Sequence, residues 1–151
     1  MRLFAAMFLV IACLSPVEAQ PSNEGWRWAD AVRVQYPANI FPKKLGKTER
    51  YEGEKLGSAD GSSSLSVYSF ANKRQESPAA YLNRTLVVDP KNIIYKRVTP
   101  RFFVISDVRN ENIYYSRCNF GRFVRCVFLE YPAAQKARWD SVVTRISHSL
   151  L

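Results

Sequence analysis

Few side chains in this sequence have the types and the spacing that catalysis or metal binding requires. The 151-residue chain has one histidine, His148, and three cysteines. Its carboxylates, among them Asp107, Glu130 and Asp140, are dispersed, so that no two are spaced as an acid and a base. A zinc site takes several histidine and cysteine ligands together, and no such set is present. We therefore expect no catalytic residues, no metal site and no cofactor, and a protein that is not an enzyme.

Positive charge is the strongest indication of function. The chain has 22 Lys and Arg against 13 Asp and Glu, a net charge of +9. Between residues 91 and 125, eight basic side chains accompany only two acids, Asp107 and Glu111. On adjacent antiparallel strands they could gather into one positive face that attracts acidic proteins or other anionic molecules. The residues that we expect to bind such a partner are Lys96, Arg97, Arg101, Arg117, Arg122 and Arg125. The alternative is a solvated surface without a ligand.

Residues 1–19 have the pattern of a secretory signal peptide. Arg2 precedes an uncharged apolar stretch, and small residues stand at the −3 and −1 positions of a cleavage site between Ala19 and Gln20. We expect an exported protein, periplasmic or secreted, without a transmembrane segment in the mature chain. The alternative is a lipid anchor on Cys13, because residues 10–13 (Val-Ile-Ala-Cys) resemble a lipobox. Export also argues against nucleic acid as a specific partner, and no motif for it is present.

Removal of residues 1–19 leaves two cysteines, Cys118 and Cys126, in an oxidising compartment, which favours a disulfide. The two face each other if the hairpin between them turns about Arg122, and they then lie within the separation that a disulfide allows. A redox role is the alternative, but the spacing is not Cys-x-x-Cys. The cleavage removes one basic residue, Arg2, and one acidic residue, Glu18, so the net charge stays +9.

The elements that must position these residues form one α+β domain over 31–151, after an N-terminal tether over 20–30. Alternating or apolar runs predict strands at 31–36, 51–58, 64–70, 93–98, 102–108, 113–118 and 123–131. Residues 37–50 carry two prolines and several basic side chains, which suits an exposed connection. Ser77 and Pro78 indicate a helix start. Apolar residues at helical spacing predict a last helix that covers one face of the sheet: Trp139, Val142, Val143, Ile146 and Leu150.

Several short motifs together resemble small exported bacterial proteins of unassigned function that look like members of the Mog1/PsbP-like superfamily. They are residues 36–37 (Tyr-Pro), 40–41 (Ile-Phe), 58–61 (Ser-Ala-Asp-Gly), 65–68 (Leu-Ser-Val-Tyr), 102–106 (Phe-Phe-Val-Ile-Ser), 113–115 (Ile-Tyr-Tyr), 129–132 (Leu-Glu-Tyr-Pro) and 139–146 (Trp-Asp-Ser-Val-Val-Thr-Arg-Ile). The resemblance covers about residues 30–150. It implies an antiparallel sheet of about five to seven strands covered by helices.

Members of the superfamily mostly bind other proteins, as photosystem accessory subunits, as partners of a nuclear transport GTPase, or as bacterial lipoproteins and chaperones. The resemblance supplies no catalytic residues. The strong positive charge and the pair Cys118 and Cys126 depart from the nearest look-alikes. We therefore expect an exported binding or accessory protein that uses a basic surface to hold an acidic protein or an anionic envelope component. The alternatives are an envelope enzyme of hydrolase type, and a structural stability factor without a fixed ligand.

Overall fold

The computed structural model describes residues 25–49, 51–85 and 88–151, and the expected signal peptide lies outside these ranges. The described residues form nine strands and two α-helices. The strands are β1 (Trp26–Ala29), β2 (Val34–Pro37), β3 (Lys43–Lys47), β4 (Glu52–Gly57), β5 (Ser64–Ala71), β6 (Ile93–Val98), β7 (Phe102–Arg109), β8 (Asn112–Phe120) and β9 (Phe123–Pro132). The helices are α1 (Pro78–Thr85) and α2 (Lys136–Ser149).

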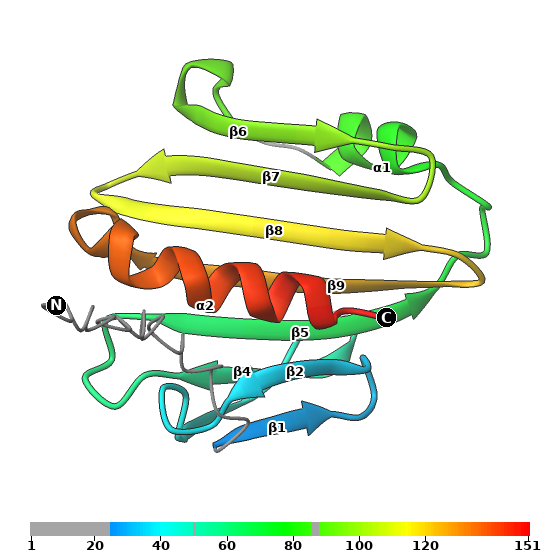
Figure 1. Cartoon of the computed structure of the whole chain (residues 1–151). Coiled ribbons are helices and arrows are strands. Elements are labelled where there is room, and N and C mark those ends of the chain that lie inside the picture. The colour runs from blue at the N-terminus through cyan, green and yellow to red at the C-terminus, as the bar shows by residue number, and fades with distance from the viewer. Residues whose placement is uncertain (1–24, 50, 86–87) are drawn as a thin grey trace, which may run out of the picture.

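Seven strands pair antiparallel in the order β3-β4-β5-β9-β8-β7-β6, and β1 and β2 form a separate two-stranded sheet (Figure 1). Tight turns make this arrangement possible. Asn110 and Glu111 connect β7 to β8 with φ values of 47° and 64°, the left-handed backbone of a two-residue hairpin turn. The expected α+β fold with a sheet of up to seven strands is confirmed.

The α2 helix lies across one face of the sheet, over β8, β9 and β5 (Figure 1). Its predicted apolar stripe packs there, because Trp139, Val143 and Ile146 are buried against Leu65, Val67, Val127 and Leu129 from the strands. The β1–β2 hairpin extends the same core, to which it adds Ala29, Val34 and Tyr36. Among the described residues, no helix has the length and the apolar character needed to cross a membrane.

The α1 helix lies on the opposite face of the sheet. Ser77 caps its first turn, with the Ser77 hydroxyl accepting a hydrogen bond from the Ala80 N–H at 3.2 Å. Tyr81 and Leu82 pack against a second core that includes Phe103, Val124 and the disulfide between Cys118 and Cys126. The two cysteines are direct partners in the register of β8 and β9, so the hairpin turns about Arg122 as predicted.

The structure contains two strands that the sequence did not indicate. Trp26–Ala29, inside the expected tether, pairs with β2, and the Trp26 side chain is partly buried against the main core. Lys43–Lys47, inside the expected exposed connection, pairs with β4 as an edge strand. All five residues of β3 are exposed, and lysines on an edge discourage pairing with another chain. Neither strand buries every second residue, so neither segment has the alternation of apolar and polar residues that predicts a strand.

Candidate anion-binding site

Arg97 and Arg117 approach the same aromatic ring from neighbouring strands. The register places Arg97 of β6 and Arg117 of β8 on either side of Val104 in β7. Cross-strand partners project from the same face of a sheet, so both side chains lie on the α2 face, as Phe102 does. The Cζ atom of Arg97 is 5.5 Å from the centroid of the Phe102 ring, and that of Arg117 is 4.6 Å from it. Both distances allow a cation–π interaction.

The C-terminal turn of α2 holds the Arg117 guanidinium in place. Arg117 donates a hydrogen bond from Nε to Asn119 Oδ1 at 3.0 Å and a second from one terminal nitrogen to Ser147 Oγ at 3.2 Å. Ser147 Oγ also accepts from the Tyr115 hydroxyl at 2.6 Å, and Asn119 donates to the Leu150 carbonyl at 2.8 Å. Burial raises the pKa of Tyr115, which keeps its phenol protonated as a donor. These contacts preorganise one side of the site.

Among the residues that the structure describes, neither Arg97 nor Arg117 has an acidic partner. The three ion pairs among the described residues join Glu76 to Arg84, Asp107 to Arg109 and Asp140 to Lys136. Burial lowers the pKa of Arg117, and the nearby Arg97 lowers it further. Both effects reflect a cost of keeping the guanidinium charged at this position, and an anion beside it would offset that cost.

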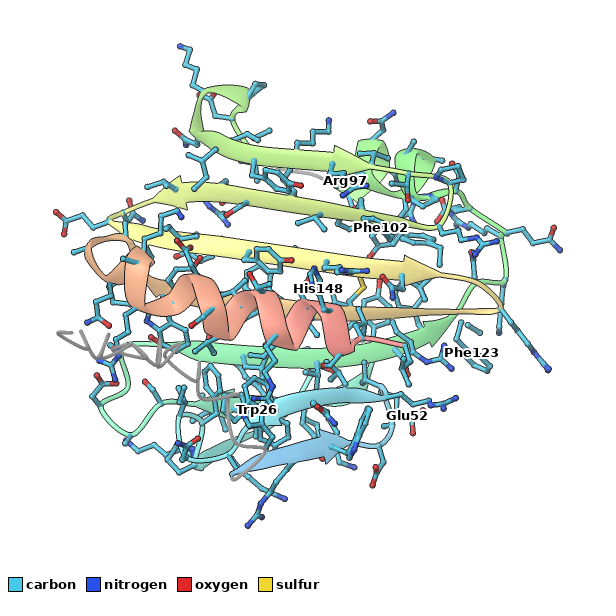
Figure 2. The ribbon with its side chains drawn as sticks, in the orientation of Figure 1. Trp26, Glu52, Arg97, Phe102, Phe123 and His148 are labelled. Carbon is cyan, nitrogen blue, oxygen red and sulfur yellow. A yellow bond between two sulfur atoms is a disulfide. The ribbon has the colours of Figure 1, made fainter. Side chains whose placement is uncertain are left out.

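A hollow of about 400 Å³ lies between α2 and the β6–β7–β8 part of the sheet. Besides the two arginines and Phe102, its lining includes Tyr95, Tyr115, Ser147 and His148. Figure 2 shows Arg97, Phe102 and His148 on the side of the sheet that carries α2. Within the described part of the chain no Asp or Glu contributes to the lining, so this hollow presents donors and positive charge to a ligand. We refer to it as the arginine hollow.

The other four predicted binding residues lie outside the arginine hollow. Arg101 and Arg122 occupy the β6–β7 and β8–β9 turns at one end of the sheet, where the Phe120 N–H donates to the Arg101 carbonyl. Arg125 pairs in register with Asn119, so it projects from the α2 face near this end. Lys96 is the neighbour of Arg97 along β6 and therefore points to the opposite face. The structure thus brings Arg97 and Arg117 together and sets Lys96 apart.

Three further lining residues come from parts of the chain whose role the sequence left open or missed. Tyr95 and Tyr115 belong to the same segment, 91–125, as the basic residues, and Tyr114 faces away from the arginine hollow. His148 stands in the last turn of α2, and the sequence predicted no binding role for it. It lines the hollow because α2 crosses the sheet at this position.

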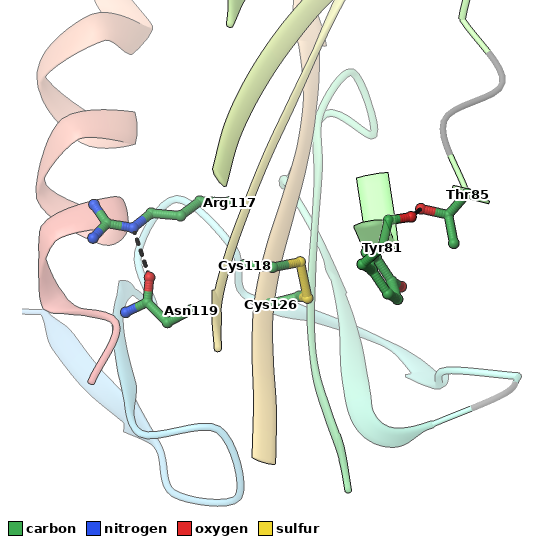
Figure 3. The surroundings of a disulfide bond; sticks show 6 residues. All are labelled: Tyr81, Thr85, Arg117, Cys118, Asn119 and Cys126. Atoms are coloured by element: carbon green, nitrogen blue, oxygen red, sulfur yellow. Dashed lines mark hydrogen bonds between the residues drawn. A yellow bond between two sulfur atoms is a disulfide. The ribbon is translucent and has the colours of Figure 1, made fainter. Parts of the chain in front are cut away.

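The disulfide lies on the other side of the sheet from Arg117. Figure 3 shows Arg117 and Asn119 directed toward α2, whereas Cys118 and Cys126 are directed toward Tyr81 of α1. Alternation along β8 explains this separation, since successive side chains project from opposite faces. Across residues 25–49, 51–85 and 88–151, no group of three or more His, Cys, Asp or Glu side chains is placed to hold a metal ion.

Comparison with known proteins identifies the class of fold. No family model matches the sequence, and no curated protein matches it. The antiparallel sheet with a helix on each face is a PsbP-like fold. One solved structure that shares it is the solution structure of cyanobacterial PsbP (CyanoP) from Synechocystis sp. PCC 6803, with a TM-score of 0.56. The match covers 78% of this chain and 84% of that chain at 11% sequence identity, and it shows the fold alone.

Proposed function

We propose that this protein is an exported, non-enzymatic binding or accessory protein of the bacterial envelope, and that its arginine hollow holds an acidic group of a partner protein or another anionic envelope component. The observation that carries the proposal is the convergence of Arg97 and Arg117 on Phe102 without a carboxylate among the lining residues. Guanidinium groups with free donors pair well with carboxylates and phosphates. The net charge of +9 would attract such a partner over a longer range.

Replacement of both arginines, Arg97→Gln with Arg117→Gln, should weaken binding of a short fluorescein-labelled polyglutamate peptide at least about tenfold. Hydrogen bonds to charged groups contribute about 1.5–3 kcal/mol each, so the loss of two of them should weaken binding by more than about tenfold. Fluorescence anisotropy in about 0.1 M salt measures the affinity. Binding to the unsubstituted protein should fall strongly in about 1 M salt, where charges are screened over about 3 Å.

The matched control carries Arg27→Gln and Arg138→Gln, which remove the same charge from two exposed positions away from the arginine hollow. Its affinity should stay within about twofold of the unsubstituted protein, because only long-range attraction changes. Equal weakening by both double variants would mean that net charge, and not this site, determines binding. Salt-insensitive binding would contradict the electrostatic mechanism.

The export part of the proposal rests on the pattern of residues 1–19 and is compatible with the disulfide in the described domain. When the gene is expressed in a bacterial host, mass spectrometry of the mature protein should find Gln20 at the N-terminus. Lipidated Cys13 at the N-terminus would instead indicate an anchored protein. A chain that retains residues 1–19 in the cytosol would contradict export.

A further inference from the structure

A second hollow, of about 300 Å³, lies on the α1 face of the sheet, away from the arginine hollow. Five of its lining residues are aromatic: Tyr68, Tyr81, Phe103, Tyr114 and Phe128. The rings of Tyr81 and Phe103 are stacked with centroids 6.1 Å apart. Its size and aromatic lining are typical of pockets for small molecules. We refer to it as the aromatic hollow.

The aromatic hollow exists because α1 is too short to cover its face of the sheet. The eight residues of α1 span about 12 Å, whereas the eight residues of β7 extend over about 26 Å. Beyond α1, Tyr114 and Ser116 of β8 and Phe128 of β9 remain only partly buried. The floor of the aromatic hollow is therefore sheet surface that no helix in residues 25–49, 51–85 and 88–151 covers.

An ion pair between buried Asp107 and Arg109, whose side chain is 40% exposed, forms the polar end of the aromatic hollow. Asp107 is only 4% exposed and accepts a hydrogen bond from Arg109 Nε at 3.2 Å. The Arg109 guanidinium in turn stacks on Tyr114, with Cζ 4.0 Å from the ring centroid. A carboxylate can accept about four hydrogen bonds. Among the described residues, Arg109 is the one side chain that donates to Asp107, so acceptor capacity remains at the edge of the aromatic hollow.

The charged side chains of the aromatic hollow indicate which kind of ligand it can bind. The positive charge of Arg109 disfavours a cation, and the buried carboxylate of Asp107 disfavours an anion. The Tyr68 phenol is uncharged at neutral pH, and burial raises its pKa further, to about 12. A flat neutral ring can pack against the aromatic residues of the hollow, and a single N–H or O–H on it can reach a carboxylate oxygen.

We propose that the aromatic hollow binds a small neutral aromatic molecule that donates one hydrogen bond to Asp107. The inference is independent of the proposed function, since the two hollows lie on opposite faces of the sheet and share no residue.

Indole tests this proposal, because it is neutral, flat and has one N–H donor. Saturation-transfer NMR with the mature protein should show that indole binds and that 1-methylindole, which lacks the donor, binds at least about tenfold more weakly. An unmade hydrogen bond to a buried polar group accounts for a difference of this size. Equal binding of both compounds would overturn the role of Asp107, and absence of binding at millimolar indole would overturn the site.

A pair of matched variants locates the bound indole. Ser116→Phe fills the aromatic hollow from β8 and should reduce indole binding at least about tenfold, whereas Ser141→Phe on the exposed side of α2 should leave it unchanged. Equal binding to the two variants would contradict the proposal. The methylindole comparison needs no substitution, so it remains decisive if Ser116→Phe fails to fold. Indole binding that survives Arg97→Gln with Arg117→Gln separates this result from that of the proposed function.

Discussion

Trp139→Ala is expected to lower the free energy of unfolding by about 3–5 kcal/mol, the usual cost of removing a large buried aromatic side chain. Trp139 is 6% exposed and lies near the start of α2. Its ring stacks on Tyr131 of β9 with centroids 5.3 Å apart and is 5.7 Å from the ring of Phe41. One side chain therefore joins the helix, the central sheet and the segment before β3, and alanine would leave a cavity among all three.

Urea denaturation followed by circular dichroism measures this loss. Trp28→Ala is the matched control, since Trp28 is 49% exposed on β1 and is not part of the main core. Its substitution should cost less than about 1 kcal/mol, because exposed positions contribute little to stability. Similar losses for the two tryptophans would mean that the contacts of Trp139 do not stabilise the domain in solution.

Burial patterns explain which elements the sequence predicts. In β5, Leu65, Val67 and Ser69 are buried and the residues between them are only partly buried. This alternation is visible in the sequence, so the strand is predictable. In α2, the stripe from Trp139 to Ile146 marks the buried face of the helix. Strand β3 lacks such a signal, because its lysines are exposed on both sides and a register shift follows Lys44. An edge strand that buries nothing can be identified only from its pairing.

The candidate site is predictable in its charge but not in its geometry. Basic residues between 91 and 125 identify Arg97 and Arg117 as candidates, yet they identify Lys96 equally. Only the strand register decides that Arg97 faces α2 and Lys96 does not. Ser147, which fixes Arg117, lies 30 positions further along the chain. Such contacts depend on where α2 crosses the sheet, a tertiary feature that no local pattern specifies.

The aromatic hollow had no signal in the sequence. In the sequence, Asp107 is one of several dispersed carboxylates. It is buried because it lies on β7 and faces the α1 side of the sheet. The aromatic residues that line it come from α1 and from four strands, β5, β7, β8 and β9. Residues so far apart in the chain assemble a pocket only through the strand order, which the alternation within each strand does not determine.

Gly53→Ala is expected to destabilise the domain by about 1–3 kcal/mol, the usual cost of forcing an extra group into a packed interior. A Cβ atom at this position of β4 would overlap the Val67 carbonyl oxygen and lie 2.7 Å from both Cα and Cβ of Tyr68. These are mostly backbone atoms of β5, so rotation of a side chain cannot remove the overlap. Strand β4 would have to move away from β5 and weaken the pairing between them.

Gly121→Ala provides the matched control in the same urea experiment. A Cβ at Gly121 would meet no atom nearer than the Phe123 carbonyl oxygen at 3.9 Å, and the backbone there does not need a positive φ. We expect a change within about 0.5 kcal/mol, because nothing has to shift. If the two substitutions lower the free energy of unfolding equally, the close approach of β5 is not the reason why position 53 requires glycine. Because Tyr68 both overlies Gly53 and lines the aromatic hollow, Gly53→Ala should also weaken indole binding, whereas Gly121→Ala should not.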